Sequence, residues 1–182
     1  MRSIFRFLQH HRFSPLCVTV SLVTGISFFT RLILLIWSWK NIEIGVFTIP
    51  AIFLIGLYYD LVVSAFFCIP VALYIWLMKD SWYQARWSRI PLFILFFLII
   101  FILVLNAGSE ITFWNEFSVR FNFIAVDYLV YTNEVIGNIF QSYNMPLILG
   151  AVMMLTLMLL WFFRKRLIAS QQVSMRFGKR SL

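Results

Sequence analysis

Two ionisable side chains lie inside long apolar stretches, where a charge is costly. Arg31 interrupts the apolar residues 16–39, and Asp60 interrupts residues 51–78. Each charge costs roughly 2.5–3.5 kcal/mol at the centre of a membrane helix, and such groups normally face an opposite charge or a wet cavity. The two residues lie at a similar depth, about eight or nine residues from one end of their stretches. We therefore expect an ion pair between the first two helices, which either only fixes their packing or also binds a lipid headgroup or lines a polar path.

A second group of polar residues lies in the segment from Ser109 to Asn144, which is too polar for a membrane span and too aromatic for an ordinary loop. At about 100° per helical residue, its polar residues fall within an arc of about 60°. This pattern predicts an amphipathic helix in the outer interface, with a favourable i, i+4 pair between Glu116 and Arg120. Its charged stripe binds a lipid headgroup, docks another domain or is simply solvated. The stripe consists of Glu116, Arg120, Asp127 and Glu134, together with Asn138 and Gln141.

No other residues combine in a way that predicts catalysis or metal binding. His10 and His11 are adjacent but lack further ligands at metal-binding spacing. Cys17 and Cys68 lie in apolar runs, where thiols behave as small hydrophobic groups. No nucleotide-binding loop or metalloprotease motif is present. We therefore expect no catalytic residue, no metal site and no cofactor in this chain.

The composition places these residues in a membrane. Of 182 residues, 62% are hydrophobic and only 12% are charged, against about 25% charged residues in soluble domains. A helix needs roughly 20 residues to cross a bilayer, and unbroken apolar runs exclude the alternating pattern of a membrane barrel. We predict an all-α, polytopic membrane bundle with one external interfacial segment at residues 109–144. Its four transmembrane helices are expected at residues 16–39, 51–78, 90–106 and 146–163.

The net charge of +8 is explained by a membrane orientation. If residues 44–78 cross once, one side holds twelve basic residues and one acid, and the other holds two basic and five acidic residues. Cytoplasmic segments are enriched in Lys and Arg, so we expect cytoplasmic ends at residues 1–15 and 168–182 around a membrane domain at residues 16–167. Two short crossings would place most of the basic residues outside. This topology also disfavours nucleic-acid binding by the basic tail.

Two stretches of the chain resemble one protein family. Residues 113–139 are similar to the membrane domain of lipoteichoic-acid-synthase-like proteins, above all to the Gram-negative branch related to phosphoglycerol transferases of periplasmic glucans. The stretch Gly56-Leu57-Tyr58-Tyr59-Asp60, followed by Ala65 and Pro70, resembles the second helix of the same family. The likeness is specific in the first stretch and loose elsewhere between Ile33 and Leu167.

The resemblance implies about five membrane helices and then an extracytoplasmic domain of the alkaline-phosphatase/sulfatase superfamily. That domain holds a threonine nucleophile and a divalent metal, and transfers phosphoglycerol or phosphoethanolamine from a phospholipid. No position here matches those catalytic residues, so we expect the truncated membrane-anchor portion of such a transferase, inactive alone, in the bacterial inner membrane. Its expected partners are membrane phospholipids and a sulfatase-type catalytic domain. The alternative is a small stand-alone membrane protein that binds lipid or assists assembly of a larger complex.

Overall fold

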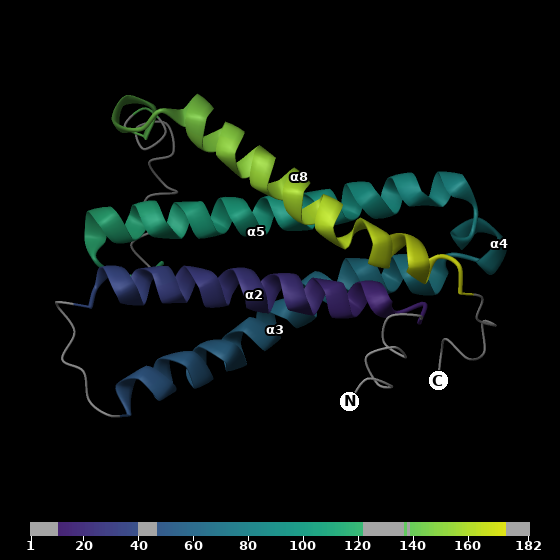
Figure 1. Cartoon of the computed structure of the whole chain (residues 1–182), viewed down its shortest axis with the longest axis horizontal. Helices are drawn as coiled ribbons and strands as arrows, with labels where there is room; N and C mark the ends of the chain where they lie inside the picture. The colour runs from purple at the N-terminus through teal and green to yellow at the C-terminus, as the bar shows by residue number, and fades with distance from the viewer. Residues whose placement is uncertain (1–10, 40–46, 122–136, 138, 174–182) are drawn as a thin grey trace.

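The described part of the chain forms a bundle of four long helices (Figure 1). The computed structural model describes residues 11–39, 47–121, 137 and 139–173. The long helices are α2 (Ser14–Trp37), α3 (Thr48–Leu77), α5 (Arg89–Phe117) and α8 (Met145–Ser170), and a short helix α4 (Asp80–Tyr83) and a 3₁₀ turn η1 (Arg86–Ser88) connect α3 to α5. Each long helix has the length and apolar composition that a membrane span requires. The chain is therefore a multi-pass, all-α membrane protein, as the sequence predicts.

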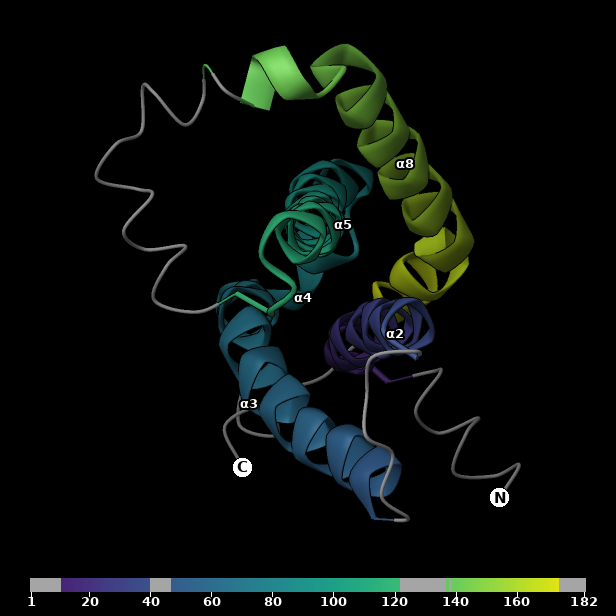
Figure 2. The same ribbon diagram turned by 90° about the vertical axis from the view of Figure 1, so that its left-hand side faces the viewer.

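Helices α2 and α5 form the centre of the bundle. Helix α3 packs on α2, α8 packs on α5, and the last turns of α8 also reach α2 (Figures 1 and 2). We call the end at which α2 begins and α8 ends the α4 end, and the opposite end the open end. At the open end, α3 diverges from α2 and α8 diverges from α5 (Figure 2).

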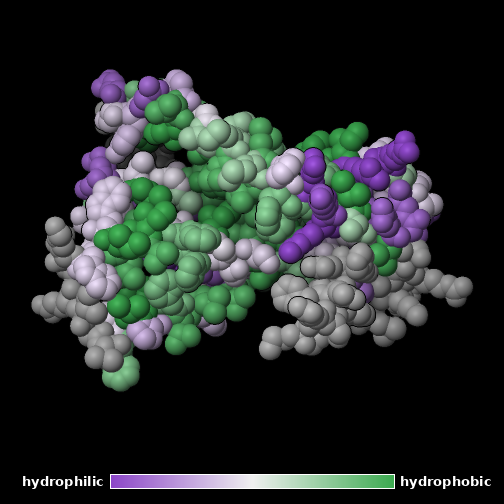
Figure 3. Space-filling view, viewed as in Figure 1, coloured by the Kyte–Doolittle hydropathy of each residue, from purple (hydrophilic) through white to green (hydrophobic). Residues whose placement is uncertain are grey.

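The bundle core is formed by stripes of side chains at helical spacing. In α2 the stripe includes Val18, Leu22 and Val23, and in α5 it includes Phe96 and Ile100. Large apolar side chains also cover much of the outer surface, and they form a band between more hydrophilic ends (Figure 3). Water would not tolerate so large an apolar surface, whereas lipid tails cover it without cost. The surface thus agrees with the membrane assignment from helix length.

Residues 44–78 were open to two interpretations, and the structure places Thr48–Leu77 in one helix. Its 30 residues span about 45 Å at about 1.5 Å per residue. Pro70 lies inside this helix. These residues therefore form one continuous helix, as the single crossing in the charge argument requires.

A separate helix does not begin at Ser109, because this residue lies inside α5. The sequence analysis ended the span at residue 106 and began a separate interfacial helix at Ser109, but α5 continues to Phe117. The hydroxyls of Ser109 and Thr112 donate to the carbonyls of Leu105 and Ser109, so both are satisfied within the helix. The helix ends at Ser118, whose φ of 54° lies in the left-handed region. The polar residues between Asn106 and Phe117 thus continue the helix of the third span.

Candidate functional site

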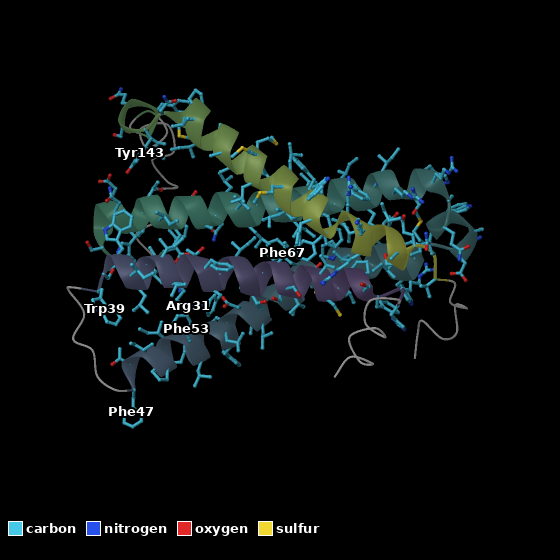
Figure 4. The ribbon with its side chains drawn as sticks, in the orientation of Figure 1. Arg31, Trp39, Phe47, Phe53, Phe67 and Tyr143 are labelled. Carbon is cyan, nitrogen blue, oxygen red and sulfur yellow. The ribbon has the colours of Figure 1, made fainter. Side chains whose placement is uncertain are left out.

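Arg31 and Asp60 form a buried ion pair between α2 and α3. Arg31 Nη2 lies 3.1 Å from Oδ1 and 3.0 Å from Oδ2 of Asp60, and only 5% of Arg31 and 7% of Asp60 are exposed. Figure 4 places Arg31 on the side of α2 that faces α3. The two residues that the sequence predicted as a pair are therefore in contact, and each compensates the charge of the other within the membrane.

A stripe of small residues on α3 allows this close approach. Gly56, Asp60 and Ser64 recur every four residues and are all buried, so they share one face of the helix. A Cβ atom on Gly56 would lie 2.2 Å from Cζ of Arg31. The guanidinium thus lies directly on the backbone of α3, and Gly56 is the residue that makes room for it.

Asp60 leaves part of the hydrogen-bonding capacity of Arg31 unused. A guanidinium carries five N–H donors, but the hydrogen bonds of Arg31 to described residues all come from Nη2. Its buried Nε has no hydrogen-bond partner among the described residues. Buried donors without an acceptor are costly. Nε is packed against Gly56 and cannot be reached, so Arg31 offers a further anionic or carbonyl oxygen its charge and its Nη1 donors.

A cleft of about 810 Å³ opens beside Arg31 at the open end of the bundle. Its walls come from α2, from the first turns of α3 and from the end of α5. Two cationic side chains line it, Arg31 at its inner part and Arg120 beyond the end of α5. The remaining walls are mainly apolar and aromatic and include Leu34, Ile55 and Trp114. Mostly apolar concavities with a few polar groups are typical of ligand sites.

Arg120 is held at the cleft by an ion pair with Glu110. After α5 ends at Ser118, the chain turns back, and Nε of Arg120 donates to Oε1 of Glu110. The Glu110 side chain is 8% exposed and the Arg120 side chain 47%. The anchored member of this pair is therefore the carboxylate within the helix, and the accessible member is the cation that lines the cleft.

Glu116 and Arg120 of the predicted polar stripe do not lie on one helix face. The sequence analysis paired Glu116 with Arg120, but the left-handed residue Ser118 separates them. Arg120 instead contacts Glu110, and Glu116 accepts a hydrogen bond of 2.8 Å from the hydroxyl of Tyr143. This bond to a carboxylate, followed by burial, raises the pKa of Tyr143. Three other predicted members of the stripe, Asp127, Glu134 and Asn138, lie outside the described residues.

A polar cluster at the α4 end was missed by the sequence analysis. Arg12 is completely buried. Its guanidinium bonds to the Asp80 carboxylate and to the carbonyls of Ile75 and Met78, and it lies 4.2 Å from the ring centroid of Tyr83. These contacts fasten the start of α2 to the end of α3. Asp80 is the single acid among twelve basic residues at this end, which indicates a counter-charge for one of them but not that its partner is Arg12.

Hydrogen bonds extend this cluster to α8 and η1. The Tyr83 hydroxyl and Ser170 Oγ are 3.1 Å apart, and the Tyr74 hydroxyl donates to the Ser88 carbonyl at 2.7 Å. Burial raises the pKa of Tyr83, although the bond to Ser170 and the charge of Arg12 oppose that shift. We call Arg12, Asp80, Tyr83, Ser88 and Ser170 the clasp. Together with Tyr74, the clasp connects the residue stretch before α2 to the end of α3, α4, η1 and the end of α8.

Neither region resembles a metal site. Within the part of the chain that the structure describes, no three His, Cys, Asp or Glu side chains are grouped so that they could hold a metal ion. The chemistry of the cleft is therefore that of arginine side chains and apolar walls, which suits the binding of an anion with an apolar body.

Comparison with protein-family models, with curated proteins and with solved structures finds no match to this chain. The resemblance to lipoteichoic-acid-synthase-like membrane domains therefore stays a prediction from the sequence. The functional conclusion has to rest on the cleft and on the distribution of charge.

Proposed function

We propose that this chain is the membrane-embedded part of a phospholipid-headgroup transferase and that it holds a phospholipid in the cleft between α2, α3 and α5. The observation that carries this proposal is the combination of two arginines with apolar walls in a cleft at one end of a membrane bundle. A phospholipid has the matching chemistry, an anionic phosphate attached to apolar chains. Arginine is well suited to phosphate because its planar donors match the phosphate oxygens.

The depth of the two arginines fits the parts of a phospholipid. Arg31 lies six residues before Trp37, the last residue of α2, which is about 9 Å along a helix. Arg120 follows the end of α5, where the bilayer interface is expected. In this arrangement Arg120 meets the phosphate, and the free donors of Arg31 face the ester carbonyls below it.

The distribution of charge favours an extracytoplasmic open end. Basic residues gather at the α4 end, where Arg12, Lys79, Arg86 and Arg89 lie near the ends of helices and residues 164–166 add three more. Such segments are normally cytoplasmic. With the α4 end inside the cell, the cleft opens to the outer leaflet of a bacterial inner membrane, where an external catalytic domain would take its substrate.

Quenching of Trp114 by brominated phosphatidylglycerol tests the binding. The full chain is placed in micelles of phosphatidylcholine, and brominated phosphatidylglycerol is added. The tryptophan fluorescence of the W114F variant is subtracted, so that only Trp114 at the cleft is observed. We expect saturable quenching, roughly tenfold weaker in R120Q, the equivalent of about 1.4 kcal/mol. The W161F variant is the matched control, because Trp161 lies exposed on α8. Quenching that only follows the lipid fraction and ignores R120Q would refute the site.

A phosphotransfer assay tests the division of labour within the proposal. The purified chain, incubated with labelled phosphatidylglycerol, is expected to release no glycerol phosphate, because the chemistry is assigned to a catalytic domain outside this membrane part. Turnover above background by this chain alone would contradict the proposal, even if Trp114 reports binding.

A further inference from the structure

The two members of the Glu110–Arg120 pair differ in exposure, and only Arg120 is accessible to a ligand of the cleft. Glu110 projects from the interior of α5 and is almost buried. Arg120 lies beyond the helix end and is about half exposed. Arginine has a long, flexible side chain, whereas the position of Glu110 is fixed by the helix. Arg120 can therefore rotate away from Glu110, but Glu110 cannot follow it.

The structure also shows that Glu110 is the carboxylate that neutralises Arg120. The other nearby acid on α5, Glu116, bonds to Tyr143 instead. The bond to Glu110 comes from Nε of Arg120, which is one of the donors that a phosphate would need for bidentate binding. Glu110 thus already takes up one hydrogen-bond donor of Arg120, the cation at the mouth of the cleft.

We infer that Glu110 is an internal competitor for Arg120 and sets the affinity of the cleft for the phosphate of a phospholipid. This inference rests on the proposed function and adds a specificity-determining residue that contacts no ligand. When a phosphate binds, Arg120 exchanges one oxyanion for another. A zwitterionic lipid, whose own ammonium already neutralises its phosphate, competes less well with Glu110 than an anionic lipid does.

The E110Q variant tests the competition directly. Glutamine keeps the size of the side chain and an acceptor oxygen but removes the charge, so Arg120 is released for the phosphate. We expect half-maximal quenching of Trp114 at roughly one tenth of the wild-type fraction of brominated phosphatidylglycerol, a change typical of one charged hydrogen bond. The matched control is E116Q, which removes an equal charge from the same helix but not from Arg120, and it should leave the half-maximal fraction unchanged.

The double variant E110Q/R120Q separates this inference from the proposed function. If Glu110 acts through Arg120, E110Q has no effect once Arg120 is replaced. The competition is supported if E110Q binds the lipid more tightly than wild type and if E110Q/R120Q binds it no more tightly than R120Q. Unchanged or weaker binding in E110Q, together with weaker binding in R120Q, overturns the competition but leaves the lipid site intact. No effect of R120Q in either background overturns both.

An equal gain in E110Q and E116Q would also refute the competition, because it would show that only the net charge of the open end matters. Circular dichroism of each variant confirms that α5 still forms, so that a loss of binding by unfolding is recognised as such.

Discussion

The two ends of the bundle use arginine in opposite ways. At the α4 end, Arg12 is fully buried and bonds to a carboxylate and two backbone carbonyls. Towards the open end, Arg31 is nearly as buried, but its hydrogen bonds to described residues all go from one nitrogen to Asp60. Both residues are buried arginines that contact a carboxylate, yet Arg12 bonds through both Nη1 and Nη2, whereas Arg31 bonds through Nη2 alone. Burial of a charge therefore does not by itself mark a binding site.

The difference lies in how the helices end. Arg12 bonds to carbonyls at the end of α3, which have no partners within their own helix. It therefore stabilises a helix terminus and joins two helices at once. Arg31 lies inside α2, six residues before its last residue, beside a continuous helix where the backbone carbonyls are already used. Its hydrogen bonds to described residues use Nη2 alone, so Nη1 can bond to a group that enters the cleft.

Replacing Arg12 should have the largest effect on stability. The R12M variant keeps an apolar stem of similar length but leaves Asp80 and two helix-end carbonyls without their cation. We expect a loss of about 3–5 kcal/mol, the range for breaking a buried ion pair, measured by unfolding in mixed micelles with circular dichroism. R86M is the control, because Arg86 is an exposed cation at the same end. Equal stability of R12M and R86M would show that the clasp does not hold the bundle.

Breaking the Arg31–Asp60 pair should cost somewhat less and should be reversible by a second change. D60A leaves Arg31 in the membrane without a counter-charge, which costs about 2.5–3.5 kcal/mol on insertion scales. The swapped variant R31D/D60R should recover part of this loss in the same unfolding assay. If the swap is no more stable than either single variant, the two charges do not stabilise each other as a pair.

The fold and the intramembrane pair could be predicted from the sequence, because neither prediction requires knowledge of tertiary contacts. A charge in an apolar stretch must find a counter-charge, and Arg31 and Asp60 were the only ionised residues well inside the predicted spans. Helix type and number followed from the length of the apolar stretches. Each of these inferences depends on local sequence and on the bilayer alone.

The cleft and the clasp could not be predicted because they depend on where helices end and diverge. The continuation of α5 to Phe117 and the left-handed Ser118 decide that Arg120 meets Glu110 rather than Glu116. Periodicity over residues 109–144 assumed one helix axis and therefore paired the wrong residues. Similarly, Arg12 was assigned to the basic terminus, because the residues next to it in the sequence do not indicate a contact with Asp80, 68 residues away.

The close contact between α3 and Arg31 is tested by adding one carbon atom. G56A places a methyl group against the guanidinium, so Arg31 or α3 must shift, and we expect a loss of about 1–3 kcal/mol, as for overpacked sites. G25A is the control, because a Cβ there meets nothing within 4 Å. That change should be neutral or stabilise α2 by up to about 1 kcal/mol. Stability lost equally in both variants would mean that helix propensity, not the contact, decides the outcome.

The smallest effects concern the pKa of one tyrosine at each end. Removing its hydrogen-bond partner should lower the pKa at the open end and raise it at the α4 end. The pKa of Tyr143 is raised mainly by its bond to the Glu116 carboxylate, so E116Q should lower it towards the ordinary value of about 10. The pKa of Tyr83 is raised mainly by burial and lowered by its bond to Ser170, so S170A should raise it further. Ultraviolet difference titrations of each variant against its Y143F or Y83F partner isolate these signals.

In both tyrosines the folded protein holds the proton more tightly than the unfolded chain does. Their contribution to stability is therefore complete below the ordinary pKa of about 10 and is lost as the pH rises through the raised pKa. Since Tyr83 belongs to the clasp, its ionisation removes a contact between α4 and α8, whereas ionisation of Tyr143 affects only the exposed link to Glu116. Alkaline pH should therefore loosen the bundle at the α4 end in wild type, and in Y83F this loosening should shift to higher pH. Loosening that follows Y143F instead would place the controlling contact at the open end.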